Sequence, residues 1–324
     1  MSLTLLIGGA TSFAVAVMFL PLVIGLAKGE AKQPILEYVD QHKGKAGTPT
    51  MGGLGFILPS CAVTLITAKN GLSSGRVAAI VTLSYAVLGF LDDFLKVKRK
   101  DNGGLTPWQK IIGQAFVAGI MGWYVYRSGL TNVRFPFTSF SFDIGYWIIP
   151  VVAFVFIAMS NGVNLTDGLD NLAASSVTTY LAAFSIILVY LSVRKNLDED
   201  LALFAVCLCF SLLAFSLYNS SPAKIFMGDT GSLSLGGAAA AVATFSENFI
   251  IAGILGITFV LSCISVIIQV CVYKLRKRRV FLMAPFHHHL EKKGWSEPRI
   301  VALYAAITAI AGLICVYGVL GFQV

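Results

Sequence analysis

Charged side chains are scarce in this sequence. Asp, Glu, Lys and Arg make up 12% of its 324 residues, whereas hydrophobic residues make up 56%, and such a balance lies outside the range of soluble globular domains. The six cysteines lack the spacing of a disulfide framework or a metal site, which predicts buried, reduced thiols. No basic-aromatic motif for DNA or RNA is present, so nucleic acid is not an expected partner. The composition predicts an integral membrane protein.

Long apolar runs fill most of the chain. Their length, about 17 to 25 residues in most cases, suits membrane-spanning helices, and they lack the alternating pattern of outer-membrane strands. We therefore predict an all-α polytopic membrane protein, a single domain over residues 1–324, with about ten transmembrane helices. The predicted spans are 3–27, 51–67, 76–91, 109–126, 145–161, 172–193, 200–218, 231–245, 248–272 and 299–321.

The basic residues are distributed unevenly between the two sets of alternate loops. One side carries 18 of the 24 Lys and Arg residues and the other carries 6. Because short basic loops stay in the cytoplasm, both termini are predicted to lie outside and the histidine-bearing loop inside. The net charge of +8 suits anionic lipid headgroups or a phosphorylated substrate.

A first polar cluster, "GFLDDFLKVKRK", ends the third predicted span with Asp92 and Asp93 and continues with Lys96. Adjacent carboxylates at a membrane boundary are costly. One interpretation is that they pair with nearby lysines just outside the lipid. The other is a general base or metal-binding acid beside phosphate-binding cations.

Two further clusters lie after the fifth and seventh spans. In "SNGVNLTDGLDNLA", Asp167 and Asp170 are three residues apart, so one face of a helical turn could present both, although helix capping also explains such residues. In "YNSSPAKIFMGDTGSLSLGG", Asp229 precedes a Gly- and Ser-rich helix start. Free amides there could bind a phosphate while the carboxylate holds a hard cation. The competing interpretations are Asp229 as a simple N-cap and Phe226 as a lipid-facing anchor.

The fourth cluster contains three of the four histidines, His287, His288 and His289, in "MAPFHHHLEKKGW". Adjacent residues on a helix point about 100° apart, so the three rings cannot all bind one zinc ion. One imidazole could bind or donate to a phosphate while a second packs and a third orients it. A purely structural role is the alternative.

All four clusters, with "HKGKAGTPTMGG" from His42 to Gly53, fall on the predicted inside face. Such a site suits phosphoryl transfer between a soluble donor and a membrane-bound acceptor. A transporter is the strongest rival, since aspartates at membrane edges also build ion paths. However, the sequence shows no clear inverted repeat and no carboxylate at mid-span, and a structural scaffold would not require these clusters.

Five motifs, "GTPTMGG", "GFLDDFLK", "NLTDGLD", "FMGDTGS" and "PFHHHLEKKGW", together resemble those of the polyprenyl-phosphate N-acetylhexosamine-1-phosphate transferases. The resemblance runs from about Lys43 to Trp295. Within that family, three consecutive histidines after a proline are typical of the branch that uses a muramoyl-pentapeptide donor. Ser262 and Cys263 depart from the family pattern, which has Glu and Thr there.

The resemblance implies a Mg²⁺-dependent enzyme on the cytoplasmic face of the bacterial plasma membrane. It would transfer phospho-MurNAc-pentapeptide from UDP-MurNAc-pentapeptide to undecaprenyl phosphate, giving lipid I and UMP, the first membrane step of peptidoglycan synthesis. Transfer of another UDP-sugar phosphate is the nearest alternative. Direct attack by the lipid phosphate and a two-step path through an aspartyl phosphate would use the same residues. A homodimer through the first and last spans stays open.

The same resemblance assigns roles to individual residues. Asp229 would bind Mg²⁺, Asp92 would deprotonate the lipid phosphate, and Asp93 and His288 complete the catalytic set. The substrate-binding residues would be the phosphate-binding lysines Lys45, Lys96 and Lys110, the uridine-side residues Asp167, Gly168, Leu169, Asp170, Asn219 and Phe226, and, with them, Asn164, His287 and His289.

Overall fold

The structure is a computed structural model that describes residues 3–30, 47–69, 71–99, 103–195 and 197–322. These residues form twelve α-helices and one two-stranded hairpin. The elements are α1 (Leu3–Glu30), α2 (Leu54–Thr67), α3 (Ser74–Arg99), α4 (Pro107–Arg127), β1 (Asn132–Arg134), β2 (Ser141–Asp143), a 3-10 turn (Gly145–Trp147), α5 (Ile148–Thr166), α6 (Leu172–Lys195), α7 (Glu199–Asn219), α8 (Gly228–Phe245), α9 (Phe249–Leu255), α10 (Ile257–Arg276), α11 (Phe286–Lys292) and α12 (Glu297–Phe322).

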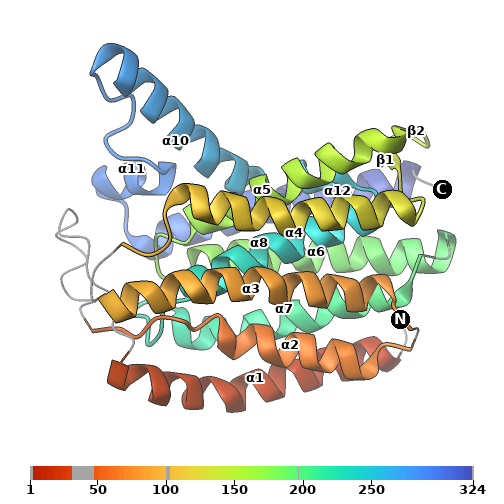
Figure 1. Cartoon of the computed structure of the whole chain (residues 1–324), viewed down its shortest axis with the longest axis horizontal. Coiled ribbons are helices and arrows are strands. Elements are labelled where there is room, and N and C mark those ends of the chain that lie inside the picture. The colour runs from red at the N-terminus through yellow and green to blue at the C-terminus, as the bar shows by residue number, and fades with distance from the viewer. Residues whose placement is uncertain (1–2, 31–46, 70, 100–102, 196, 323–324) are drawn as a thin grey trace.

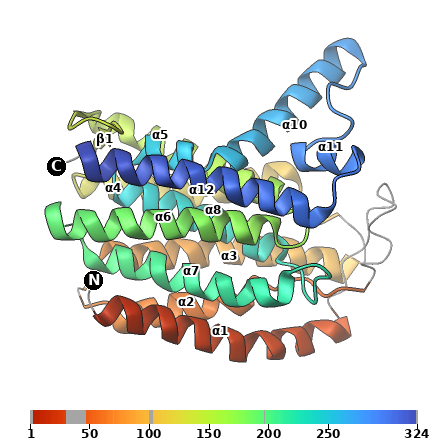
Figure 2. The same cartoon turned by 180° about the vertical axis from the view of Figure 1, so that it is seen from behind.

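Most of the helices lie side by side along one direction (Figures 1 and 2). Seven of them, α1, α3, α5, α6, α7, α10 and α12, are long and apolar enough to cross a membrane. Helices satisfy their own backbone hydrogen bonds, as lipid requires. The predicted all-α polytopic membrane fold is confirmed. The other three predicted spans coincide with α2, α4 and α8, which run beside the seven, and the total of ten spans stays a prediction.

The ninth predicted span, 248–272, is two helices rather than one, so that prediction was wrong. Gly256 separates α9 from α10, and glycine weakens a helix because it lacks a β-carbon and loses more backbone freedom on ordering. After this break α10 leans away from the other helices (Figures 1 and 2). The prediction that all cysteines are buried fails on this helix, because Cys271 is exposed and Cys263 is half-buried.

Helix α8 lies in the middle of the molecule, and its residues from Thr230 to Phe245 are all buried. Its Gly- and Ala-rich sequence lets α3 and α5 approach closely, as small residues do in membrane helices. On α3, a β-carbon at Gly89 would overlap the backbone oxygen of Asp229. The missing side chain at Gly89 therefore brings the end of α3 against the start of α8.

Both termini and the hairpin lie at one end of the molecule, and α11 lies at the opposite end (Figures 1 and 2). The strands pair antiparallel, with Asn132 opposite Asp143. A buried carboxylate, Glu247, holds the hairpin by accepting from the Asn132 amide at 3.0 Å and pairing with Arg134 at 2.7 Å. The shared end for the two termini agrees with the predicted topology, while the side of the membrane that it faces stays a prediction.

Candidate active site

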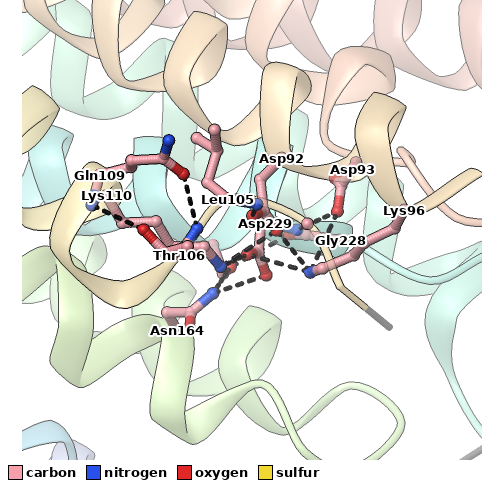
Figure 3. A network of polar contacts seen from close by, with 12 residues as sticks. Asp92, Asp93, Lys96, Leu105, Thr106, Gln109, Lys110, Asn164, Gly228 and Asp229 are labelled. Carbon is pink, nitrogen blue, oxygen red and sulfur yellow. Dashed lines mark hydrogen bonds and ion pairs between the residues drawn. The ribbon is translucent and has the colours of Figure 1, made fainter. Parts of the chain in front are cut away.

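Three carboxylates meet where the end of α3 touches the start of α8. Asp92 and Asp93 come from α3 and Asp229 comes from the first turn of α8 (Figure 3). One oxygen from each lies within 4.8 Å of the others. Asp92 and Asp93 are buried and Asp229 is half-buried. Since buried like charges repel strongly, this arrangement requires cations or hydrogen-bond donors close by.

Two lysines supply much of that positive charge. Lys96 Nζ lies 2.6 Å from Asp92 Oδ2 and 3.2 Å from Asp229 Oδ2, and Lys110 Nζ lies 3.0 Å from the same Asp92 oxygen and hydrogen-bonds Asp229. Asp92 thus pairs with a nearby lysine, as the structural interpretation predicted. The pair is not isolated, however, because Lys110 from α4 and Asp229 from α8 join it, which gives a compact site of mixed charge.

The start of α4 is fixed by its own sequence, and this fixes Lys110. Thr106 accepts from the Gln109 amide at 3.3 Å while the Gln109 side chain accepts from the Thr106 amide at 2.9 Å, a capping box with Pro107 at the first helical position. The preceding amide, that of Leu105, donates to Asp92 Oδ1 at 2.7 Å. The chain entering α4 therefore contacts Asp92 through both a backbone amide and a lysine.

Asp93 serves mainly to hold the start of α8. Its carboxylate accepts from the Asp229 amide at 3.1 Å and from the amide and hydroxyl of Thr230 at 2.8 and 2.7 Å. The expectation of free amides for a phosphate at this helix start was wrong for these two, because the neighbouring helix already supplies their acceptor. Two of these three donors are backbone amides, which are fixed in place, so Asp93 is a less available ligand than Asp229, whose donors are side chains.

Asp229 is not the N-cap of α8. The N-cap is Met227, and the Asp229 side chain instead faces the polar cluster (Figure 3). Asn164 near the end of α5 donates to Asp229 Oδ1 at 2.9 Å and to Ser232 Oγ at 2.8 Å. The simple-capping interpretation is therefore wrong, and the side-chain oxygens of Asp229 point at the groups a cation or phosphate would meet.

These carboxylates fit a hard divalent cation. Oxygen ligands from Asp side chains are the ones that Mg²⁺ prefers, and no other group of acidic, Cys or His side chains in the described parts of the chain has comparable geometry. Asp93 is bound by backbone amides of α8, whereas the donors at Asp229 are side chains that can move aside, so Asp229 would hold the ion.

The segment between α5 and α6 forms a second part of the site. It is a turn and not a helix, so the prediction that one helical face presents Asp167 and Asp170 was wrong. Asp170 Oδ2 accepts from the Ala223 amide at 3.1 Å. The amide of Asn171 donates to Asn219 Oδ1 at 2.9 Å. Asn219 also donates to the Ile225 carbonyl at 2.8 Å. Asp170 and Asn219 therefore tie this turn to the loop before α8.

Asp167 lies next to this turn, directly after α5, and is half-buried. Removal from solvent, followed by the nearby charges of Asp229 and Asp93, raises the pKa of Asp167 to about 8. The group therefore keeps a proton near neutral pH and can donate a hydrogen bond.

The loop before α8 is held by the segment that precedes α2. The Phe226 amide donates to the Pro49 carbonyl at 2.8 Å, and the Gly52 amide donates to the Phe226 carbonyl at 2.9 Å. Phe226 is half-buried, and both the lipid-facing and the uridine-stacking interpretations of its ring stay predictions. Lys45, predicted to bind phosphate, lies outside the described residues.

The three histidines occupy different surroundings on α11. His287 is buried and lies edge-on to Tyr304, with ring centres 6.4 Å apart. His289 Nδ1 accepts from the Leu282 amide at 3.1 Å, and partial burial followed by the charge of Lys293 lowers its pKa. His288 Nδ1 lies 2.9 Å from a Glu291 carboxylate oxygen. His287 is thus a ring that packs, while the binding of a phosphate by one imidazole and the orienting role of another stay predictions.

A small separate core fixes α11 against the turn between α5 and α6. It consists of Leu169, Leu172, Leu290, Ile300 and Tyr304. Leu169 is thus a core residue, whatever else it contacts. At the centre of this contact, a β-carbon on Gly168 would overlap His287 Nε2 and lie 3.0 Å from His288 Nε2.

Gly168→Ala is therefore expected to push α11 away from the turn. The reason is steric, since protein interiors have little room for an added methyl group. We expect faster amide hydrogen exchange over residues 286–292 and at least a tenfold loss of activity. Gly253→Ala is the matched control, because its added methyl group meets no atom within 4 Å. Unchanged exchange over α11 in the Gly168 variant would contradict this packing.

Ser262, where the family pattern has Glu, is buried on α10. Its hydroxyl accepts from Thr166, the last residue of α5, at 2.9 Å and donates to the Thr258 carbonyl at 3.0 Å. Three residues later, Ser265 accepts from the Phe286 amide at 3.0 Å. The departure therefore leaves no charge here, and α10 contacts both α5 and the start of α11 through hydroxyl groups.

Several residues of the site carried no signal in the sequence interpretation. Thr230, Ser232 and the Leu105 amide join the network only because α3, α4, α5 and α8 meet there. Glu291 is different, since its spacing of three from His288 on a helix places the two side chains on one face. That spacing could have identified it.

Comparison with known proteins agrees with this geometry. The profile of Glycosyl transferase family 4 matches residues 76–247, the part of the chain that supplies all three clustered aspartates. The phospho-N-acetylmuramoyl-pentapeptide-transferase signature 1 matches residues 45–57. This helical membrane protein, with its acidic site at one end, is therefore a member of glycosyl transferase family 4.

Full-length relatives narrow the assignment. The chain is 42% identical over 304 residues to the phospho-N-acetylmuramoyl-pentapeptide-transferase of Clostridium perfringens, covering 92% of this chain and 93% of the relative. The proteins of that name from Geobacillus thermodenitrificans and Bacillus subtilis are 42% and 38% identical, each over 97% of this chain and 97% and 96% of the relative. The chain belongs to the phospho-N-acetylmuramoyl-pentapeptide-transferase family.

Proposed function

We propose that this membrane transferase moves phospho-MurNAc-pentapeptide from UDP-MurNAc-pentapeptide to undecaprenyl phosphate, forming lipid I and UMP with Mg²⁺ as cofactor. The site would face the cytoplasm of a bacterium, where the soluble nucleotide donor is available. The observation that carries the proposal is the meeting of Asp92 and Asp229 with Lys96 and Lys110, in a chain of this family.

The charge of the site suits two phosphorylated substrates. Lys96 and Lys110 each contact both Asp92 and Asp229, so each ammonium group lies where it can also contact phosphate oxygens. A bound Mg²⁺ would supply Lewis-acid stabilisation of pyrophosphate charge. Phosphoryl transfer depends mainly on positioning and charge stabilisation, and the lysines contribute both without forming a covalent bond.

Asp92 would act as the base towards the lipid phosphate. Its Oδ1 is fixed by the Leu105 amide at 2.7 Å, so the carboxylate has a defined orientation. In the direct path it would remove the proton from the lipid phosphate, whose oxygen then attacks the sugar-linked phosphorus as UMP leaves. A two-step path through an aspartyl phosphate uses the same groups.

The turn at 167–170 and the loop before α8 would bind the uridine side of the donor. Asp167, Asn219 and Phe226 offer a proton donor, a buried amide and an aromatic ring respectively. The histidines on α11 border this turn at Gly168 and would contact the phosphate and sugar end.

The decisive experiment measures UMP release by the purified chain in detergent with undecaprenyl phosphate and Mg²⁺. We expect release with UDP-MurNAc-pentapeptide and at most a trace with UDP-GlcNAc. Chelation of Mg²⁺ by EDTA should stop release, and added Mg²⁺ should restore it.

The possible outcomes separate the alternatives. Release with UDP-GlcNAc alone would keep the sugar-phosphate transfer and overturn the muramoyl assignment. No release with either donor, from protein with a cooperative thermal transition, would overturn the proposed reaction and favour the transport interpretation. Full activity in EDTA would contradict the proposed Mg²⁺ requirement alone.

A further inference from the structure

A contact between His288 and Glu291, both on α11, joins an imidazole to a carboxylate. His288 Nδ1 lies 2.9 Å from Glu291 Oε2. The glutamate is 2% exposed and follows His288 by three residues, on the same face of the helix. A buried carboxylate is costly unless it is hydrogen-bonded. The contact is therefore most stable when a proton lies between the imidazole nitrogen and the carboxylate oxygen.

That arrangement follows from the chemistry of the two groups. An ionised carboxylate only accepts hydrogen bonds, so the imidazole must supply a proton from Nδ1. In a neutral ring the other nitrogen, Nε2, is then unprotonated. His288 Nε2 is also the atom that lies close to Gly168, in the turn between α5 and α6. The basic nitrogen therefore faces the turn that carries Asp167.

His289 has the opposite arrangement. Its Nδ1 accepts from the Leu282 amide at 3.1 Å, so this nitrogen carries no proton and the neutral ring is protonated at Nε2. Stacking on Phe286, with ring centres 5.6 Å apart, holds the ring in this orientation. Two adjacent histidines thus present different atoms: an acceptor on His288 and a donor on His289.

We propose that Glu291 is a positioning residue that holds the proton on His288 Nδ1 and so makes His288 Nε2 the atom that meets the substrate. When Nε2 takes up a proton from solvent, the ring becomes an imidazolium that can donate to a phosphate oxygen, and the carboxylate compensates its positive charge. His287, packed between Tyr304 and Gly168, supports this arrangement sterically. The role in transfer rests on the proposed function, whereas the placement of the protons does not.

The first arm of the test measures the protons directly and needs no substrate. The full chain, labelled with [¹⁵N]histidine and held in lipid nanodiscs, contains four histidines, so long-range ¹H–¹⁵N spectra can be assigned with single His→Asn variants. The spectra are recorded at pH 8. We expect His288 to be protonated at Nδ1 and His289 at Nε2.

Glu291→Gln should disturb His288 selectively, because the amide can donate as well as accept. We expect the His288 signals to shift towards a mixture of the two tautomers while those of His289 stay within the spread of replicate spectra. Lys292→Gln, an exposed neighbour on the same helix, is the matched control and should change neither. A wild-type His288 protonated at Nε2, or an unchanged pattern in Glu291→Gln, would overturn the proposal.

The second arm measures transfer. For Glu291→Gln we expect kcat to fall by roughly 100-fold, within the range of general acid–base effects, with KM changed by less than about threefold and the pH–rate profile displaced. Glu291→Asp should recover part of the loss. A tautomer shift with unchanged kcat would overturn the role in the reaction. If the wild-type chain does not release UMP at all, the proposed function fails, and the spectra still decide the proton placement.

Discussion

Asp229→Asn is expected to lower kcat for UMP release by about 1000-fold or more. Metal coordination contributes several kcal/mol to transition-state stabilisation, and every 1.36 kcal/mol corresponds to a factor of ten. The amide keeps one oxygen but loses the negative charge that attracts a divalent ion and that pairs with Lys96 and Lys110. Initial rates at saturating Mg²⁺ and donor measure the effect.

The control for this variant is Asp143→Asn, which removes an exposed carboxylate on the hairpin at the opposite end of the molecule. We expect its activity to stay within twofold of the wild type. Thermal unfolding of both variants in the same detergent separates loss of fold from loss of chemistry. An Asp229→Asn protein with more than a tenth of wild-type kcat would contradict the assignment of the metal ligand.

The same substitution at the two adjacent carboxylates of α3 should affect different properties: the reaction rate for one and the stability of the fold for the other. Asp92→Asn is expected to reduce kcat by roughly 10²–10⁴-fold, the range of general base catalysis. Its effect on Tm should be smaller than that of Asp93→Asn, because the amide oxygen still accepts from Leu105 and both lysines still pair with Asp229. Asp93→Asn is expected to lower the free energy of unfolding by about 1–3 kcal/mol, because buried donors of Asp229 and Thr230 lose acceptor atoms.

Rates and unfolding midpoints measured on the same preparations distinguish these roles. Thr230→Val is a matched variant for the supporting role of Asp93, since it removes the hydroxyl that donates to Asp93 at 2.7 Å. It should lower Tm, as Asp93→Asn does. If Asp92→Asn lowers Tm as much as Asp93→Asn does, the separation between a reacting and a supporting carboxylate is wrong.

The membrane fold could be predicted from the sequence because its cause is compositional. Apolar runs long enough to span a membrane exclude a soluble domain. In lipid, such a run satisfies its backbone hydrogen bonds by forming a helix. The broken span at Gly256 was missed because hydropathy averaged over a window does not register one glycine. The buried-thiol prediction failed at Cys271 for a related reason. Averaged hydropathy does not show how a helix is oriented, and α10 leans away from its neighbours, which leaves Cys271 exposed.

The candidate residues could be predicted because charge is so rare in this chain that each polar cluster is conspicuous. Their roles were harder to predict. Asp92 and Asp93 are chemically identical in the sequence, yet one contacts two lysines and the other accepts from three donors at the start of α8. This difference depends on the rotation of α3 against α8, which is set by contacts such as that of Gly89 with Asp229.

The sequence by itself determined that this protein is helical, spans a membrane and concentrates its acidic, basic and histidine side chains in a few loops and helix ends, because hydropathy and charge act on each segment independently. Only the tertiary structure decided which of these groups share a site. Asp92 and Asp229 are far apart in the chain, as are Gly168 and His287. Contacts between such segments follow from side-chain packing in three dimensions, which no local pattern specifies.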